Sequence, residues 1–183
     1  MTILIVIAAI VIAAVMMYNG MISARNRVDN AYAQIDVMLK KRFDLIPNLV
    51  ATVQQYAEHE MNVLTKIVEM RNRSYSEMTQ DEKVAMDGEV RQAMRSINVI
   101  AENYPDLKAS ANFEQLQRSL NETEEQISAA RRTYNAAVTD YNTTIESFPN
   151  NLVAKRFGHS ARQLLETPVA ERENVSVKDL FKK

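Results

Sequence analysis

Few residues in this chain have side chains that could carry out chemistry. It contains no Cys and two His, His59 and His159. The segment around His59 reads Ala-Glu-His-Glu, but the zinc motif His-Glu-x-x-His needs a second His at position 63, which is Val63. Di-metal helical bundles use Glu-x-x-His on facing helices, and no Glu stands three residues before either His. We therefore expect no catalytic residue, no metal and no cofactor, and a metal-dependent enzyme ranks last among the functions considered.

A second group of polar residues surrounds a proline in RFDLIPNLV, residues 42–50. Pro47 has no N–H and its ring displaces a preceding carbonyl, which leaves backbone groups for Arg42, Asp44 or Asn48 to satisfy. In the structural interpretation these residues form a polar latch around a helix kink. In the functional one the kink is a hinge or a site for a partner. Both interpretations stay open.

A third group of polar residues lies near the C-terminus. Residues 150–163 contain Lys155, Arg156 and Arg162 and no acid, which gives a local charge of +3. A short basic amphipathic helix there would touch anionic lipid at the membrane surface. The alternative is a fourth bundle helix or a strap along the bundle, followed by an extended tail over 167–183. The whole chain has a net charge of −1, so we expect no nucleic acid partner.

The elements that position these residues begin with an apolar segment. Residues 1–22 contain 19 apolar residues and no charge. This is about the length of helix that crosses roughly 30 Å of hydrocarbon. The predicted span includes Ile3, Ile10 and Met17 along its length. A cleaved signal peptide begins with basic residues and this segment has none, so we expect an uncleaved anchor in the lipid bilayer.

The basic residues around the span predict its orientation. No Lys or Arg precedes it, whereas Arg25, Arg27 and the run at 40–42 follow it. The positive-inside rule then places the N-terminus outside and the rest of the chain in the cytoplasm, as a single-pass protein of the cell (inner) membrane. Within the span, Ala9 and Ala13 form a small-xxx-small pair that would let two anchors pack closely.

A long helix is predicted to follow the span. Apolar residues recur with a helical period from Val28 to Ile67 and keep their phase across Pro47. We therefore expect the helix to kink, or to restart on nearly the same axis, and to reach about residue 75, on the order of 110 Å from its start. Asp36 and Lys40 are expected to pair on its exposed face.

Two further long helices are predicted. Thr79 and Glu82 fit a capping box that opens the second, which ends before Pro105. The third covers 113–147 and carries a heptad seam typical of helix-on-helix packing. The predicted seam residues are Phe113, Leu116, Leu120, Thr123, Ile127, Ala130, Tyr134, Ala137, Tyr141 and Thr144.

The sequence thus predicts an all-α fold. An N-terminal transmembrane helix continues into a long antiparallel helical bundle, with three long helices and a short C-terminal helix or strap. The predicted segments are a membrane anchor at 1–22, the long-helix bundle at 23–148, and the C-terminal basic segment and tail at 149–183. Only 3 Gly and no Cys argue against a turn-rich β fold and against thiolate chemistry.

Several stretches of the chain resemble the LemA family of bacterial membrane proteins. They are Tyr18-Asn19, Arg25-Asn26, Val28, RFDLIPNLV at 42–50, Tyr56-Ala57, His59-Glu60, Arg71, ENYPDLKASANFEQLQ at 102–117, ARRTYN at 130–135 and YNTTIESFPNNLVA at 141–154. The resemblance reaches about Gly158, and nothing is carried over beyond it. It implies one N-terminal membrane helix, an outside N-terminus and a cytoplasmic bundle of long helices. It supplies no reaction, because the molecular function of the family is poorly defined.

These observations favour a membrane-anchored, non-enzymatic helical scaffold or interaction protein. Its long amphipathic helices would let it self-associate into a homo-oligomer. The competing class is a signalling adaptor, in which the kink or the tail passes an envelope state to an unidentified cytoplasmic protein partner. A monomeric mass in detergent, without crosslinking in native membranes, would count against the scaffold. Capture of one stoichiometric partner would favour the adaptor.

Overall fold

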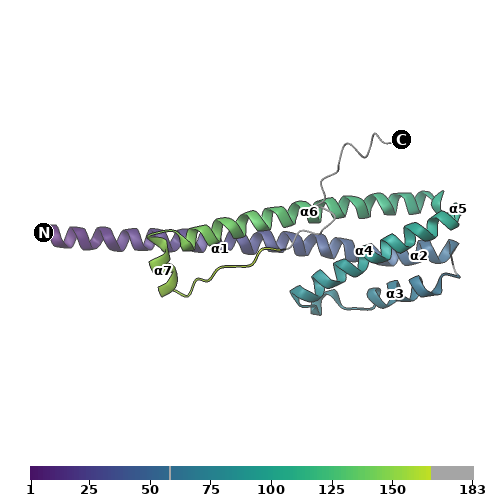
Figure 1. Ribbon diagram of the computed structural model, residues 1–183, viewed down its shortest axis with the longest axis horizontal. Helices are drawn as coiled ribbons and strands as arrows, with labels where there is room; N and C mark the ends of the chain where they lie inside the picture. Colours follow the sequence, from purple (N-terminus) through teal and green to yellow (C-terminus); the bar gives the residue numbers. More distant parts are fainter. Residues whose placement is uncertain (58, 166–183) are drawn as a thin grey trace, which may run out of the picture. The chain divides into compact units, whose positions relative to one another are not determined.

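The computed structural model describes residues 1–57 and 59–165, and every regular element in this part of the chain is helical (Figure 1). The elements are α1 (Thr2–Phe43), α2 (Ile46–Tyr56), α3 (Met61–Arg71), the 3₁₀ turn η1 (Tyr75–Glu77), α4 (Gln80–Asn103), α5 (Pro105–Lys108), α6 (Ala111–Glu146) and α7 (Asn150–Arg156). The predicted all-α fold is confirmed. The extended tail expected over 167–183 lies outside the described residues.

The chain divides into two compact units, and two helices contribute to both. Unit 1 consists of Met1–Tyr32 and Arg131–Lys183, described as far as residue 165. Unit 2 consists of Ala33–Ala130. The first part of α1 and the last part of α6 therefore belong to unit 1, and the rest of each helix belongs to unit 2.

Unit 2 is built around an apolar core shared by α2, α3, α4, α5 and the beginning of α6. The largest side chains of this core, such as Leu49, Ile67, Ile97, Leu107 and Phe113, are no more than 1% exposed. Complete burial of a side chain of this size stabilises a fold by about 1.5–3 kcal/mol. Apolar packing is therefore the main stabilising contribution in this unit.

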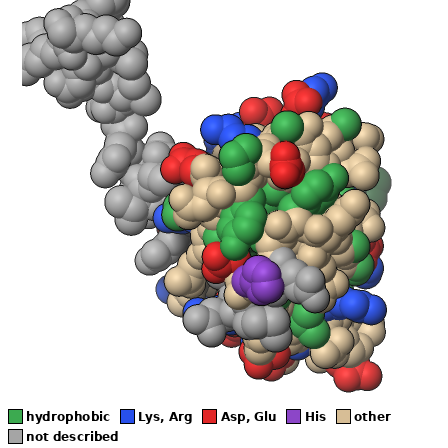
Figure 2. All heavy atoms as spheres, turned by 90° about the vertical axis from the view of Figure 1, so that its right-hand side faces the viewer, with side chains coloured by type: hydrophobic (Ala, Val, Ile, Leu, Met, Phe, Trp, Pro, Cys, Tyr) green, Lys and Arg blue, Asp and Glu red, His purple; other side chains and the backbone are tan. Residues whose placement is uncertain are grey.

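Figure 2 looks at the end of unit 2 that carries α5. Hydrophobic and uncharged side chains cover the middle of this face, and acidic and basic side chains are scattered toward its rim. On the described part of the face, the charges do not gather into a patch of one sign.

Pro47 opens a new helix, which agrees with the predicted restart. α1 ends at Phe43, and Asp44 and Leu45 form a turn before α2. The Leu45 amide donates to the Arg42 carbonyl at 3.1 Å, which closes this turn. Pro47 lies in the first turn of α2, where a backbone N–H has no intrahelical acceptor and its absence costs little.

The expected continuation of this helix to about residue 75 is wrong. α2 and α3 are separate helices that pack against each other. Ala57 ends α2 with φ −134° and ψ 50°, which is not helical geometry. Ala57, Leu64 and Ile67 share the apolar period because all three enter the same core. The apolar period therefore continues across the end of α2, because residues on both sides of it are buried in one core.

The second long helix begins with the predicted capping box. The Glu82 amide donates to Thr79 Oγ1 at 3.3 Å, and the Thr79 amide donates to Glu82 Oε2 at 2.7 Å. The Thr79 backbone N–H, helped by the Thr79 hydroxyl, holds the pKa of the Glu82 carboxyl below its ordinary value. α4 ends at Asn103, ahead of Pro105 as predicted.

The third long helix is confirmed as α6, but its buried seam shifts by one residue near the C-terminal end. The predicted seam residues are buried as far as Tyr134, after which Val138 and Ile145 are buried instead of Ala137 and Thr144. Two four-residue steps in succession, from 130 to 134 to 138, bring the seam closer to the period of a straight α-helix. The seam is buried within the chain.

In unit 1 the first part of α1 runs antiparallel to the last part of α6. The rings of Tyr32 and Tyr134 pack with centroids 5.8 Å apart. Toward the N-terminus, the ring of His159 contacts both Tyr18 and Tyr141, at 6.1 and 6.2 Å. Residue numbers along α1 therefore decrease as those along α6 increase, which is the predicted antiparallel arrangement.

The basic segment forms a helix shorter than 150–163. α7 ends at Arg156, and Gly158 follows with φ +72°, a left-handed conformation that favours glycine. The His159 amide donates back to the Ala154 carbonyl at 3.0 Å, which completes the cap. Residues 159–165, here called the strap, have no regular secondary structure. The segment therefore contains both features left open by the sequence, a short basic helix and a strap.

Candidate functional site

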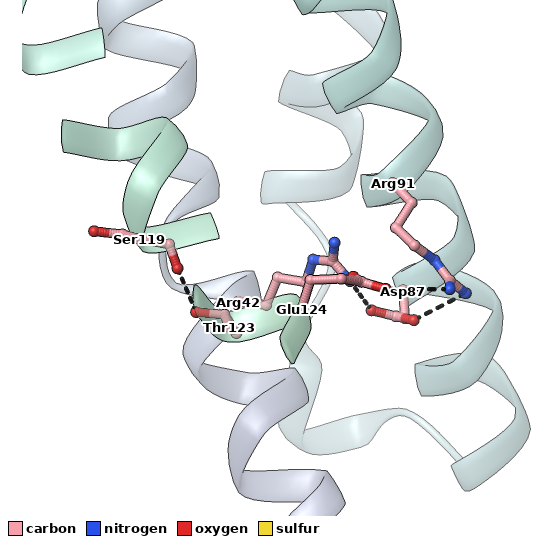
Figure 3. Close-up of polar contacts among 6 residues, drawn as sticks. All are labelled: Arg42, Asp87, Arg91, Ser119, Thr123 and Glu124. Atoms are coloured by element: carbon pink, nitrogen blue, oxygen red, sulfur yellow. Dashed lines mark hydrogen bonds and ion pairs between the residues drawn. The ribbon is translucent and has the colours of Figure 1, made fainter. Parts of the chain in front are cut away.

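Four charged side chains from three helices meet inside unit 2, and we call them the arginine cluster (Figure 3). Arg42 comes from α1, Asp87 and Arg91 from α4, and Glu124 from α6. Arg42 Nη1 lies 2.6 Å from Asp87 Oδ1 and 2.5 Å from Glu124 Oε2. Arg91 Nη2 lies 3.1 Å from Asp87 Oδ2, and Arg91 Nη1 lies 3.5 Å from Glu124 Oε1.

The arginine cluster is neutral but its charges are interdependent. The side chains of Asp87 and Arg42 are 1% and 5% exposed, and Arg42 Nε has no hydrogen-bond partner among the described residues. Removing one member of a buried ion pair leaves an uncompensated charge, at a cost of about 3–5 kcal/mol. The cluster therefore ties α1, α4 and α6 into one arrangement.

Figure 3 also shows how the α6 seam accommodates a polar residue. Thr123 is fully buried, and its hydroxyl donates to the Ser119 carbonyl at 2.7 Å within the same helix. This local bond satisfies the hydroxyl without a partner from another helix. Thr123 can therefore be buried in the predicted seam without leaving its hydroxyl unpaired.

Among the surface hollows of unit 2, two adjoin residues of the arginine cluster or of the predicted kink motif. One, of about 270 Å³, adjoins the arginine cluster and includes Arg42, Arg91, Arg95 and Glu124 in its lining. The other is a groove of about 420 Å³ between α2 and α6, lined by Leu45, Asn48, Ala51, Thr52, Asn112, Gln115, Leu116 and Ser119. Amide and hydroxyl groups dominate the polar lining of the groove, and no charged side chain contributes to it among the described residues.

The structure separates the residues of the predicted kink motif. Arg42 binds Asp87 and Glu124 from other helices, and the neighbouring carboxylate of Asp44 pairs with Lys40. Pro47 starts α2, and Asn48 faces the groove. The four residues of the motif therefore make separate contacts with different elements and do not form one polar latch.

A second polar site lies in unit 1, where the strap follows α7. The ring of Phe157 packs on that of Tyr18 with centroids 4.8 Å apart. The Tyr141 hydroxyl lies 3.1 Å from His159 Nδ1, so one of the two atoms donates to the other. The beginning of the strap is therefore held at Tyr18, near the end of the apolar segment 1–22.

Two asparagines of α6 hold the rest of the strap through its backbone, and we call them the asparagine clamp. The amide group of Asn142 accepts from the Arg162 N–H and donates to the Arg162 carbonyl, both at 2.9 Å. The amide group of Asn135 makes the same two bonds with Leu165, also both at 2.9 Å. Such bonds are independent of the side chains of the strap and fix the path of its backbone.

The predicted basic residues have different surroundings. Lys155 and Arg156 are exposed in the last turn of α7. The Arg162 guanidinium instead lies 2.6 Å from Asp29 Oδ1 on α1, with a side chain 33% exposed. Arg162 therefore fastens the strap, which leaves two of the three basic side chains facing solvent.

Two of the three predicted span residues, Ile3 and Ile10, are exposed. α1 is long and apolar enough to cross a membrane, and none of its most apolar window is buried within the chain. Ile3 and Ile10 are 74% and 63% exposed, and Met17 is partly buried.

The His-Glu pair lies between α2 and α3. His59 is exposed, and Glu60 Oε1 accepts from the Tyr104 hydroxyl at 3.3 Å. Removal from water raises the pKa of the Tyr104 phenol, and the charge of Glu60 raises it further. Within 1–57 and 59–165, no group of three or more His, Asp or Glu side chains is arranged to hold a metal ion.

The sequence reasoning missed Asp87, Glu124 and both residues of the asparagine clamp. Asp87 stands beside Met86 on the buried stripe of α4, and an acid at such a position is a signal of a buried partner. The clamp also had a signal, because a Tyr-Asn pair occurs at 134–135 and again seven residues later at 141–142. A spacing of seven places both asparagines on one side of a helix.

Known proteins match this chain over most of its length. The sequence model described as the LemA family matches residues 31–178. Among curated proteins, Protein LemA of Metamycoplasma hominis is 26% identical over 163 residues, which are 88% of this chain and 74% of that protein. The match to the family continues past Gly158, where the resemblance seen in the sequence was expected to end.

Magnetosome proteins are also similar. Magnetosome protein MamQ 2 of Paramagnetospirillum magneticum is 21% identical over 201 residues, covering 96% of this chain and 74% of that protein. Magnetosome protein MamQ of Magnetospirillum gryphiswaldense is 21% identical over 174 residues, covering 81% of this chain and 64% of that protein.

Proposed function

The chain belongs to the LemA family, and we propose that it is a membrane-anchored, non-enzymatic helical scaffold that self-associates through its membrane span. It is a membrane-associated protein with an N-terminal helix of spanning length. The proposal adds a single pass, an outside N-terminus, a cytoplasmic location for both units, and self-association.

The observation that carries the proposal is the contrast between the first twenty residues of the chain and the turns of α1 that follow them. The first twenty residues are nearly all exposed, whereas Met21, Ala24 and Val28 are buried within the chain. An exposed helix this apolar needs lipid or another helix around it. The α6 seam is buried inside the chain, so the long-helix surface expected for self-association is already occupied. The span offers the largest apolar surface left on the described residues.

The close packing of two spans would use small residues. Ala9 and Ala13 are four residues apart and lie on one face of α1, where small side chains let two backbones approach. Two copies joined there would bring their cytoplasmic units together without using either unit's core.

Cysteine crosslinking tests the self-association, because the chain has no Cys of its own. We expect Ala9→Cys and Ala13→Cys to form disulfide-linked dimers in native membranes. Val11→Cys, two residues from both and on another side of the helix, is the matched control and should crosslink much less. Equal or absent crosslinking at all three positions, together with a monomeric mass in mild detergent, would refute self-association through this face.

Thiol labelling tests the orientation. Val99 is 62% exposed on α4, so Val99→Cys gives one accessible thiol in unit 2. If unit 2 is cytoplasmic, a membrane-impermeant reagent will label it only after the cells are permeabilised. Labelling in intact cells would place the unit on the other side and reverse the proposed topology.

The groove beside Asn48 favours the signalling adaptor as a second candidate. Its amide and hydroxyl lining would suit a partner's polar backbone better than a charged ligand. Recovery of one stoichiometric protein with the native chain, lost in Asn48→Ala and retained in Asn98→Ala outside the groove, would support the adaptor. Recovery that is equal in both variants would count against it.

A further inference from the structure

Outside the membrane span, exposed apolar side chains are concentrated in and next to α7. After Met16, seven large hydrophobic side chains of the described chain are exposed, and four of them lie in residues 148–164. They are Phe148 at 81%, Leu152 at 63%, Phe157 at 60% and Leu164 at 55%. Within α7 itself only Ala154 is buried, so this helix does not pack as a fourth member of the bundle.

The same segment is basic. No acidic residue occurs from Ser147 to Leu165. Arg162 is paired with Asp29, whereas Lys155 and Arg156 are exposed and form no ion pair with the described residues. Apolar side chains beside free cations are the composition of a helix that lies in a membrane interface.

The position of α7 matches the depth at which the span leaves the hydrocarbon. The ring of Phe157 contacts Tyr18, and tyrosine is enriched at membrane–water interfaces. Within unit 1, the purple N-terminal part of α1 in Figure 1 runs without a neighbour until it reaches α7 and the end of α6. α7 is thus the first element beside the helix as it emerges from the apolar segment.

The attachment of α7 is also fixed. Gly158 ends the helix, His159 is held between Tyr18 and Tyr141, and Asn142 binds the strap backbone at Arg162. The segment therefore keeps its place relative to the base of the span.

We propose that α7 and its flanking aromatic residues form a second, peripheral contact with the membrane, which binds anionic phospholipid head groups. Phe148, Leu152 and Phe157 enter the boundary between head groups and acyl chains, and Lys155 and Arg156 bind the phosphates. The contact rests on the anchoring of α1 in the bilayer but not on self-association.

Tryptophan fluorescence tests this contact, because the native chain has no Trp. The full chain is reconstituted in vesicles of phosphatidylcholine with or without phosphatidylglycerol, and quenching by brominated lipid and by acrylamide is compared. Leu152→Trp reports on α7. Ile7→Trp reports on insertion of the span, and Val99→Trp, at an equally exposed site in unit 2, is the matched control.

We expect brominated lipid to quench Leu152→Trp severalfold more than Val99→Trp, and acrylamide to quench it severalfold less. Adding Lys155→Gln and Arg156→Gln should reduce the lipid quenching in phosphatidylglycerol vesicles, whereas Lys66→Gln with Arg95→Gln in unit 2 should not. If Ile7→Trp is quenched by lipid and Leu152→Trp behaves like Val99→Trp, the span is anchored and the peripheral contact is refuted. Protection of Leu152→Trp from acrylamide without lipid quenching would assign the surface to a protein and would also overturn the proposal.

Discussion

The two units use the same two helices but are stabilised by different kinds of contact. In unit 2, α1 and α6 are joined to α4 by four charged side chains, of which Arg42 and Asp87 are buried, and an apolar core is shared by the other helices. In unit 1, α1 and α6 meet through aromatic rings, and side-chain amides hold the backbone of the strap. One helix can therefore take part in two packing schemes along its length.

This difference determines how each unit should respond to a lost contact. A buried charge depends on every partner around it, so one substitution in the arginine cluster affects three helices together. A hydrogen bond to the strap backbone affects only the strap, since residues 159–165 follow the end of α7 and contribute no helix to the core. We expect a global effect in unit 2 and a local one in unit 1.

The largest expected effect is that of Asp87→Ala. This change removes the carboxylate that faces both Arg42 and Arg91, and leaves Glu124 to neutralise two guanidinium groups. The free energy of unfolding should fall by about 3–5 kcal/mol. Circular dichroism of the full chain in detergent during urea unfolding measures this loss, and hydrogen exchange should locate it in peptides of unit 2.

Removing both charges provides the control for this prediction. Arg42→Met with Asp87→Leu leaves the Arg91–Glu124 pair and replaces the buried ions with apolar groups of similar size. Because the desolvation cost disappears with the charges, this double variant should be more stable than Asp87→Ala. If the double variant is the less stable of the two, or if peptides of the strap exchange as fast as those of unit 2 in Asp87→Ala, the contrast between the units is wrong.

The helices were predictable because their signals are local. The capping box of Thr79 and Glu82 and the restart at Pro47 depend on neighbours within a few residues, and both occur as predicted. The α6 seam was also found, with a one-residue slip at Val138, because a strict heptad is only an approximation to the helical period.

Three wrong expectations share one cause, which is that the tertiary contacts involved left no local signal in the sequence. Asp36 was expected to pair with Lys40 four residues away, but its carboxylate instead binds Lys83 at 2.8 Å and the Tyr75 hydroxyl at 3.0 Å. The break at Ala57 was hidden because the apolar period continued across it. Arg42 was expected to bind backbone groups at the neighbouring proline kink, whereas its partners are side chains of α4 and α6.

The next largest effect is expected in unit 1, from loss of the asparagine clamp. Asn135→Ala with Asn142→Ala removes four hydrogen bonds, each worth about 0.5–1.5 kcal/mol. The amides of Arg162 and Leu165, which donate to these side chains, should lose most of their protection from hydrogen exchange. The unfolding midpoint of unit 2 should stay unchanged.

Two variants make the clamp prediction specific. Asn142→Asp keeps an acceptor for the Arg162 N–H but has no donor for the Arg162 carbonyl, so protection of that amide should fall only partly. Asn121→Ala changes an exposed asparagine of α6 outside the clamp and should leave the strap protected. An unchanged strap in the double alanine variant would show that Arg162–Asp29 and the tyrosine contacts suffice to hold it.

The smallest expected effect is a pH-dependent change in stability at the start of α4, in unit 2. Because backbone and hydroxyl hydrogen bonds lower the pKa of the folded Glu82 carboxyl, its contribution to stability is fully present above the pKa of the unfolded carboxyl. That contribution is lost as the pH falls through the lower folded pKa. The difference in melting temperature between the native chain and Glu82→Gln should therefore be constant near neutral pH and shrink in acid. Thr79→Ala, which removes the cap hydroxyl, should cost about 1 kcal/mol at neutral pH.

Glu102→Gln is the matched control at the other end of α4. There the carboxylate faces the negative end of the helix dipole, so neutralising it should leave stability unchanged or slightly higher. Hydrogen exchange should confine the effect of Glu82→Gln to the first turn of α4, because the capping box is exposed and touches neither the core nor the arginine cluster. A pH-independent difference between the native chain and Glu82→Gln would mean that the amide replaces the carboxylate fully and that the charge of Glu82 contributes nothing. Within unit 2, stability would then depend on the buried charges and not on this exposed one.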